Sequence, residues 1–218
     1  MKIDLHVHTS EVSLCGKLSA RETMRLYKEK EYDAVVITNH YNSDTARHYE
    51  NLGRPDFFNV YREGYLLAKE EGEALGIKVF NGYEIRFDGS SNDYLVYGLP
   101  NELARNFRWI CSMSSRDFSV FSKENGMLFY QAHPFRNHMT IQPPDILFGI
   151  EIKNGNPRHD SRNDIAAAWA DKYGMHKIAG SDCHQTPDAG GTGVITEREV
   201  DTEEDLLEML RCDDYTII

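Results

Sequence analysis

Short apolar segments recur along this chain, most of them separated by segments with helical periodicity, and this alternation constrains the fold more than any other feature. Strand patterns that alternate with helical ones are typical of parallel β/α architecture, in which helices cover a parallel sheet. We therefore expect an α/β protein. The predicted strands cover residues 2–8, 33–40, 77–85, 93–99, 127–134, 149–154 and 177–184.

The predicted helices carry recognisable signals at their ends. Ser19 and Glu22 have the spacing of a capping box at the start of a helix predicted over residues 18–31. A longer amphipathic helix is predicted over residues 58–75. Gly174 stands where glycine commonly ends a helix. The two remaining predicted helices cover residues 161–174 and 201–210.

Several predicted strands end on a residue that can bind a metal ion. In β/α barrels the C-terminal ends of the strands converge on one mouth, so residues that are distant in the sequence meet there. Imidazole and carboxylate groups suit Zn, Mn and Fe. We therefore expect one metal site to be built from His6, His8, His40, Glu84, His133, Asp182 and His184.

The first strand contributes two of these residues, His6 and His8, separated by one valine. Successive side chains in a strand point to opposite faces, so alternation puts both histidines on one face together with Asp4. A pair of this kind also occurs on exposed strands whose histidines meet water, and the other strand ends decide against that reading. The opposite face is expected to pack against helices through Ile3, Leu5 and Val7.

Composition restricts the class of partner. A chain of 218 residues suffices for one well-buried domain, predicted over residues 1–218. The formal net charge of −11 argues against nucleic acid as the main partner, because such surfaces are usually basic. No apolar run has membrane-spanning length and no signal-peptide pattern opens the chain, so a cytoplasmic protein without membrane contact is expected. The cysteines have no paired spacing, which suits reduced thiols at Cys15, Cys111, Cys183 and Cys212.

With these residues in place, the chain resembles the PHP family, named for polymerase and histidinol phosphatase domains. The matching stretches are DLHVHTS, VVITNH, NGYE, QAHPFR, IEIKNGNP and AGSDCH, and the opening HxH combined with the closing GSDxH is the specific part. The resemblance implies a distorted (β/α)7 TIM-like barrel that holds two or three divalent metal ions, such as Zn, Mn or Fe, at the strand ends. It also implies phosphoester hydrolysis, which most characterised single-domain members catalyse.

The resemblance assigns the ligands residue by residue. His6, His8, Glu84 and Asp182 correspond to the ligands of one metal. Glu84 corresponds to a bridge to a second metal that it shares with His133. The third site would be formed by His40 and His184.

The chain departs from the family pattern at three places. The usual TDH reads Thr38-Asn39-His40, which removes a carboxylate beside a ligand. Asp93 stands where the family often has a histidine, and it either ligates or is a surface residue at the start of a strand. In the loop after His8, Cys15 occupies the slot of a third-site ligand, with Glu11 as the alternative.

The expected reaction is hydrolysis of a small phosphomonoester. Two close metal ions can hold a bridging hydroxide, aim it at phosphorus and neutralise the developing charge. His184, His40 or a metal-bound water would protonate the leaving group, and Asp182 would support the reacting centre. Fixed contacts to the phosphorylated substrate are expected from Arg136, Arg158 and Asn154.

Two other functions fit parts of the pattern. Amidohydrolases, which hydrolyse C–N bonds, also begin with HxH, and Lys153 stands near a strand end where their bridging lysine lies, although alternation turns it away from Asn154. A non-catalytic metal-binding PHP domain is favoured by Asn39 and by the altered third site. A proofreading exonuclease shares the chemistry, but the acidic charge and the lack of a partner domain disfavour it.

Overall fold

The computed structural model describes all residues, 1–218, as a mixed α/β protein built on one curved sheet. The hydrogen-bonded order of the sheet is β10-β9-β1-β2-β4-β5-β6-β7-β8, and β3 pairs with β4. The predicted strands are confirmed, with ends that differ by at most four residues. The strands are β1 (Lys2–Val7), β2 (Ala34–Ile37), β3 (His40–Tyr41), β4 (Lys78–Ile85), β5 (Tyr94–Tyr97), β6 (Leu128–Gln131), β7 (Gly149–Asn154), β8 (His176–Gly180), β9 (Val194–Ile195) and β10 (Thr216–Ile217).

The sheet curves until β8 meets β1, so that the barrel is nearly closed. Cys183, just after β8, forms a parallel bridge with Val7, and its carbonyl accepts a hydrogen bond from the backbone N–H of His8 at 3.0 Å. The approach is close because Gly180 has no side chain: a Cβ there would lie 2.3 Å from the Cβ of His6. Seven strands, β1, β2 and β4 to β8, form the wall, which confirms the predicted TIM-like barrel.

One strand of the barrel wall departs from the expected parallel arrangement. β5 pairs antiparallel with both β4 and β6. Only residues 86–93 connect β4 to β5, and a parallel connection needs a longer crossover that usually includes a helix. Because β5 is reversed, its first residues lie at the end of the barrel where the parallel strands finish. Asp93 therefore reaches the same end as the predicted ligands.

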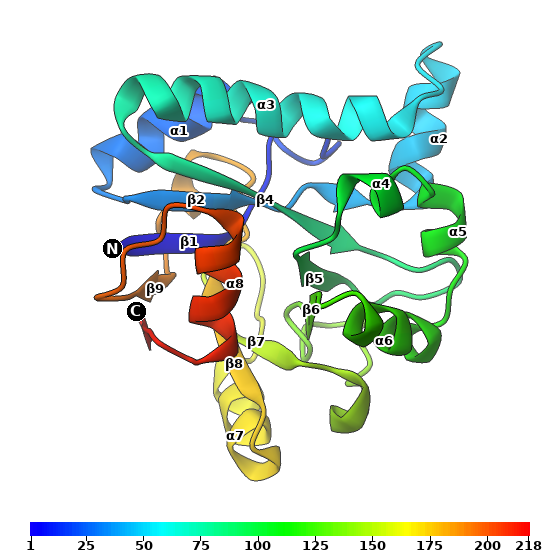
Figure 1. Ribbon diagram of the computed structural model, residues 1–218, viewed down its shortest axis with the longest axis vertical. Coiled ribbons are helices and arrows are strands. Elements are labelled where there is room, and N and C mark those ends of the chain that lie inside the picture. The colour runs from blue at the N-terminus through cyan, green and yellow to red at the C-terminus, as the bar shows by residue number, and fades with distance from the viewer.

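The barrel interior is apolar at one end and polar at the other. Side chains of the strands, such as Leu5 and Phe80, form one buried cluster with residues of α8 (Glu203–Arg211). In Figure 1 this helix lies in front of the ring of strands. Leu206, Leu207 and Leu210 thereby close the end opposite the predicted metal site.

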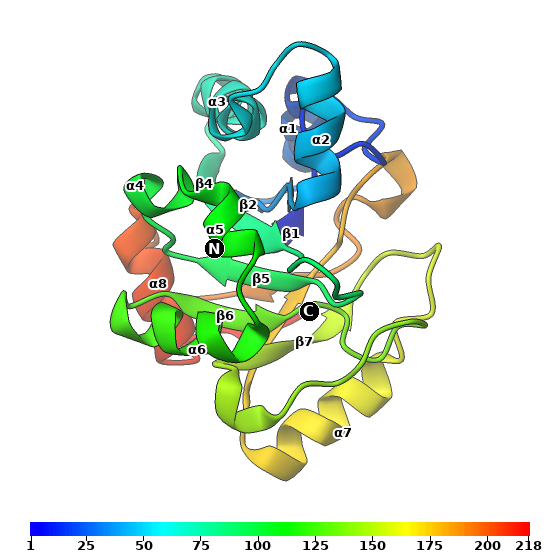
Figure 2. The same cartoon turned by 90° about the vertical axis from the view of Figure 1, so that its right-hand side faces the viewer.

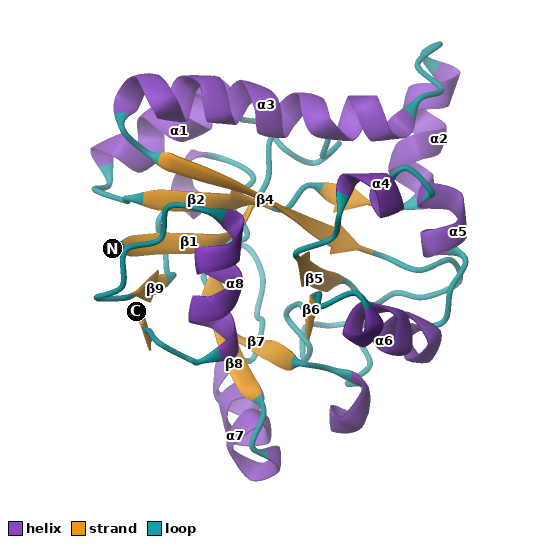
Figure 3. Ribbon diagram, in the orientation of Figure 1, coloured by secondary structure: helices purple, strands orange, loops and turns teal.

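The other helices lie around the outside of the strands (Figure 3). The predicted capping box at Ser19 and Glu22 is confirmed, and Gly174 adopts the predicted left-handed conformation at a helix end. No helix combines the length and apolar character needed to cross a membrane. Besides α8, the helices are α1 (Ala20–Glu29), α2 (Ser43–Asn51), α3 (Phe57–Leu75), α4 (Asn101–Ala104), α5 (Phe107–Cys111), α6 (Ser115–Glu124) and α7 (Asn163–Tyr173).

The long loops gather at the C-terminal ends of the parallel strands. In Figure 2 the loops after β1, β6, β7 and β8 lie on the right-hand side, where blue, yellow and orange segments from distant parts of the sequence come together. This arrangement resembles the mouth of other β/α barrels, which is formed by the loops that follow the strands.

Candidate metal centre

A β-bulge in β1 determines where its side chains point. From Asp4 to Val7 the register advances three residues, while the paired segment of β2 advances only two, from Val35 to Ile37. An extra residue of this kind reverses the alternation beyond it. The prediction that Leu5 and Val7 share a face is therefore wrong: Leu5 packs inside the barrel, whereas Val7 packs in the cluster formed with α1.

Asp4 is affected in the same way. It does not accompany the two histidines, because its carboxylate accepts hydrogen bonds from the Tyr27 hydroxyl of α1 at 2.7 Å and from the Ser181 N–H at 3.0 Å. Burial of this carboxyl group raises its pKa to about 6. His6 and His8 do share the interior side, as predicted, and both are completely or almost completely buried.

Four side chains converge on one point inside the barrel. The Nε2 atoms of His6 and His8 lie 3.3 and 3.5 Å from the two oxygens of Glu84, and 3.5 and 3.4 Å from Oδ1 of Asp182. A tetrahedral ion with bonds of about 2.1 Å separates its ligands by roughly 3.4 Å. The four side chains therefore have the spacing that a small divalent ion requires.

Unpartnered atoms at the same point support this fit. The Nε2 atoms of both histidines are buried and have no hydrogen-bond partner, and Oε2 of Glu84 has only Nδ1 of His40 beside it, at 3.0 Å. Buried polar atoms are almost always paired, so a group of orphans needs a further partner. The donor set, two imidazoles and two carboxylates, is one that Zn, Mn and Fe accept. The residues present thus fit a divalent metal ion.

A second group of possible ligands forms around Oε1 of Glu84, the oxygen that also lies near His6. Nε2 of His133 lies 3.1 Å from Oε1 of this glutamate, and Asp93 belongs to the same cluster of possible ligand atoms. Both oxygens of Asp93, however, accept hydrogen bonds of 2.7 Å from the Arg86 guanidinium. Asp93 therefore lies where the sequence predicted, but with both oxygens engaged by a cation.

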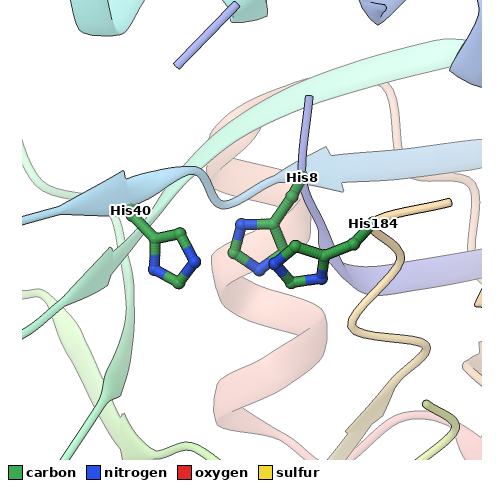
Figure 4. Close-up of side chains that lie close together, drawn as sticks. All are labelled: His8, His40 and His184. Carbon is green, nitrogen blue, oxygen red and sulfur yellow. The ribbon is translucent and has the colours of Figure 1, made fainter. Parts of the chain in front are cut away.

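The third group consists of three imidazoles, which lie side by side in Figure 4. The rings of His8 and His184 stack with centroids 4.1 Å apart, and His40 lies 4.7 Å from the first of them. Sγ of Cys15 lies 3.2 Å from Nε2 of His40. The alternative residue, Glu11, is directed elsewhere, because its carboxylate accepts the N–H of Ala20.

Glu151 positions two of the predicted ligands and was not predicted from the sequence. One of its oxygens accepts a hydrogen bond of 2.9 Å from Nδ1 of His6, and the other accepts the His133 N–H at 2.8 Å and the Asn154 amide at 3.0 Å. A carboxylate that accepts from Nδ1 leaves the lone pair of a neutral imidazole on Nε2, the atom that faces the cluster. Its one visible signal in the sequence is an acidic residue inside an apolar strand.

The loop after β1 orients His8 in a similar way. Ser13 Oγ lies 3.0 Å from Nδ1 of His8, accepts the His40 N–H at 3.1 Å and donates to Asn39 Oδ1 at 2.9 Å. Because the hydroxyl proton goes to Asn39, His8 must donate from Nδ1, which again leaves Nε2 free for an ion. Asn39, the departure from the family pattern, thus anchors Ser13 and also accepts the N–H of Thr9 at 2.8 Å.

Charge is concentrated in this cluster. Burial disfavours the imidazolium of His6, but three neighbouring carboxylates outweigh that effect and raise its pKa well above the usual value. Burial and the neighbouring imidazole of His184 lower the pKa of His8 well below its usual value. Burial alone would raise the pKa of Asp182, yet the surrounding cationic groups lower it well below the ordinary range. The carboxylate of Asp182 is therefore ionised, which is the form that binds a cation.

Two predicted ligands have unusual backbone conformations. His133 and Asp182 have φ angles of 29° and 53°, a region that residues other than glycine seldom adopt. Each follows the last residue of its strand, β6 or β8, by two positions. Such conformations persist where the surroundings over-determine them and cluster at functional sites. Here they turn the two side chains into the barrel mouth.

A cavity of about 180 Å³ lies over the cluster and is lined by Arg86, Arg136 and Arg158. Arg136 donates to Asp182 Oδ2 at 2.8 Å, which directs the other oxygen of that aspartate toward the histidines. Arg158 pairs with Asp188 at 2.7 Å. The predicted contact residue Asn154 does not line the cavity.

Comparison with known proteins finds sequence similarity over part of the chain and fold similarity over all of it. A family model described as PHP-associated matches residues 160–215, the segment that carries Asp182 and His184, and PHP-like proteins share the fold of the whole chain. The chain is thus similar to PHP-associated sequences over residues 160–215 and shares its fold with PHP-like proteins. No curated protein matches it.

Solved structures resemble this chain over nearly its full length. A two-domain protein from Bacteroides vulgatus containing a predicted PHP-like metal-dependent phosphoesterase has a TM-score of 0.68 and 20% identity, covering 100% of this chain and 64% of its own. PsfC from Pseudomonas syringae has a TM-score of 0.68 and 19% identity, covering 94% and 86%. A lesion-specific endonuclease from Pyrococcus furiosus has a TM-score of 0.64 and 13% identity, covering 99% and 57%. The chain thus spans less than two thirds of the length of the Bacteroides vulgatus protein and of the Pyrococcus furiosus endonuclease.

Proposed function

We propose that this PHP domain is a divalent-metal-dependent phosphoesterase that acts on a small phosphomonoester. The observation that carries the proposal is the convergence of His6, His8, Glu84 and Asp182 at the spacing of metal ligands, with unpartnered atoms directed at one point. The cluster lies beneath a cavity lined by arginines. Guanidinium groups bind phosphate oxygens well because their planar donors match them.

The proposed ligands follow the three groups of side chains. Oε1 of Glu84 lies near His6 and His133, and Oε2 lies near His8, which suits a carboxylate shared by two ions. His40 and His184, with Cys15, would hold a third. Bound Zn, Mn or Fe would supply positive charge for the phosphate oxygens and lower the pKa of water.

The chain's own residues bind and orient the substrate in this proposal. Arg136 and Arg158 face the cavity and would contact the phosphate, although both also hold acidic residues of the site in place. Protonation of the leaving group falls to His184 or His40 when the third site is empty, because a nitrogen that holds an ion carries no proton. His184 lies 2.9 Å from the Asp182 carbonyl through Nδ1, which must donate, so Nε2 is the atom that can exchange a proton.

A nuclease is the second candidate, because the Pyrococcus furiosus relative is an endonuclease. Its chemistry would use the same metal centre. The net charge of −11 and the small volume of about 180 Å³ over the cluster favour a small substrate. The amidohydrolase alternative is weakened because Lys153, its expected bridging residue, does not line the cavity over the cluster.

The experiment combines metal analysis with an activity panel. Elemental analysis of the purified protein is paired with phosphate release from a panel of phosphomonoesters and with cleavage assays on single-stranded and duplex DNA. The test variant is Asp182→Ala, and the matched control is Asp171→Ala, whose exposed carboxylate pairs with Lys177 on the surface.

Two or three bound ions per chain, with metal and phosphate release both lost in Asp182→Ala and retained in Asp171→Ala, would support the proposal. DNA cleavage without phosphomonoester turnover would favour the nuclease. Bound metal without hydrolysis of any phosphoester would contradict the proposal and leave the C–N hydrolase or a non-catalytic metal-binding domain.

A further inference from the structure

A larger cavity adjoins the one over the metal cluster. It has a volume of about 490 Å³ and lies between α2 and residues 86–90, the loop that follows β4. Arg86 lines both cavities. Arg86, whose guanidinium group is paired with Asp93, is therefore shared by the walls of the two cavities.

Strand pairing explains why the two cavities are neighbours. β3 and β4 run parallel, with His40 opposite Glu84. Asn42 and Arg86 follow directly after these strands, and the N–H of Arg86 still donates to the Tyr41 carbonyl at 3.3 Å. Both residues line the larger cavity. Residues two apart in a strand share a face and lie about 6.6 Å from each other. The surface that carries the metal cluster thus continues directly into the larger cavity.

The lining of the larger cavity is polar and electrically balanced. Three arginines face three carboxylates, and hydroxyl and amide groups from Asn42, Ser43 and Ser90 complete the polar surface. The arginines are also paired individually: Arg47 lies 3.2 Å from Asp44, and Arg108 pairs with Glu50. The charged lining residues are Arg47, Arg86, Arg108, Asp44, Glu50 and Asp88.

The two aromatic residues of the lining do not offer a stacking surface. Phe87 and Phe107 are only 3% and 8% exposed, because both pack in the main apolar cluster. A planar base would find no ring face here to stack on. Each arginine of the lining is paired with a carboxylate, so none is available to bind a second phosphate.

We propose that this second cavity binds the organic group of the substrate, and that this group is uncharged and polyhydroxylated, as in a sugar or polyol phosphate. The inference rests on the proposed phosphoesterase function. The cavity over the metal cluster is too small for more than a phosphoryl group and its first few atoms, since sites for larger ligands commonly exceed about 300 Å³. Paired charges and hydroxyl groups suit a ligand that both donates and accepts hydrogen bonds.

The test is a calorimetric titration of both metal-free and Mn-loaded protein. The probes are inorganic phosphate, methyl phosphate, glucose 6-phosphate, ribose 5-phosphate and adenosine 5′-monophosphate. We expect glucose 6-phosphate to bind at least about tenfold more tightly than methyl phosphate, the gain expected from two net hydrogen bonds. Phosphate release is measured from the same esters.

The variant is Ser43→Trp, which places a large ring in the second cavity. Its matched control is Asn51→Trp, an exposed position of the same helix that does not line the cavity. Ser43→Trp should reduce the preference for glucose 6-phosphate over methyl phosphate to about twofold or less, whereas Asn51→Trp should keep the wild-type ratio. Circular dichroism establishes that both variants are folded.

Equal affinity for methyl phosphate and glucose 6-phosphate would overturn the inference, whether or not phosphate is released. Tighter binding of adenosine 5′-monophosphate than of ribose 5-phosphate would also overturn it, because it would assign the cavity to a base. An unchanged ratio in Ser43→Trp would place the organic group elsewhere. A sugar-phosphate preference without phosphate release would instead support the cavity and reject the proposed function.

Discussion

Replacing Glu151 by glutamine tests how the metal centre is organised. Glu151 only accepts: its oxygens receive Nδ1–H of His6 and the backbone N–H of His133. Glutamine has almost the same shape but presents one oxygen and one NH2 group. The oxygen can satisfy the His133 N–H, which leaves the NH2 group facing Nδ1 of His6. That imidazole must then accept through Nδ1 and carry its proton on Nε2, the atom directed at the metal cluster.

A protonated Nε2 cannot bind a metal ion, so the ligand set loses one member unless the tautomer reverts. Changes to residues that orient metal-binding histidines typically lower metal affinity about 10- to 100-fold, or about 1.4–2.7 kcal/mol. The expected result for Glu151→Gln is therefore a dissociation constant raised by that factor. Competition with a chromogenic chelator measures the constant, and ¹⁵N chemical shifts of the imidazole report the tautomer of His6.

The control is Glu203→Gln, an exposed residue at the opposite end of the barrel. It should change neither the affinity nor the tautomer. If Glu151→Gln bound metal within twofold of the wild type, or if His6 remained protonated at Nδ1, the argument that Glu151 selects the tautomer would be refuted.

Three further results are expected. Ser13→Ala should lower the free energy of unfolding by about 1–3 kcal/mol, because Nδ1–H of His8 and the backbone N–H of His40 lose their acceptor. Urea denaturation measures this free energy, and a change below about 0.5 kcal/mol would contradict the hydrogen-bond assignment. Gly180→Ala should cost about 1–3 kcal/mol or more in the same assay, since the new Cβ would lie 2.3 Å from the Cβ of His6, and wild-type stability would show that β8 does not approach β1 so closely. Burial disfavours the Cys15 thiolate, but hydrogen bonds from two histidines lower the pKa of this thiol to about 6. The rate of alkylation of Cys15 in the metal-free protein should therefore rise as the pH passes about 6, and added Zn should suppress the reaction. Cys15→Ser serves as the blank, and a midpoint above about pH 8 would contradict the expectation.

The sequence predicted the strands well because each is a short apolar run with a distinct end. It also predicted that residues as distant as His6 and Asp182 would meet, since strand ends converge in a barrel. The reversal of β5 was missed because an apolar strand pattern does not depend on the direction of the strand. Only the short connection of residues 86–93 distinguishes an antiparallel from a parallel β5. Two of the helices that were not predicted, α4 and α5, are only one turn or slightly longer, and α2 and α6, of nine and ten residues, were also not predicted.

Bulges caused the remaining errors at the site. The one in β1 separates Leu5 from Val7, and another in β7 lets Glu151 and Asn154, three residues apart, hydrogen-bond on one face. Strict alternation would have put them on opposite faces. Periodicity cannot locate an extra residue, because the bulge is set by pairing with a neighbouring strand rather than by the local sequence. Glu151 was overlooked for the same reason.

The position of α8 has a consequence for biosynthesis. Its leucines close the apolar end of the barrel, yet they are made after every strand of the wall. While the ribosome is still adding residues 201–211, the strands already outside it lack the helix that covers Leu5 and Phe80. The nascent chain therefore exposes an apolar surface until very late, which is the condition under which chaperones are recruited and aggregation competes with folding.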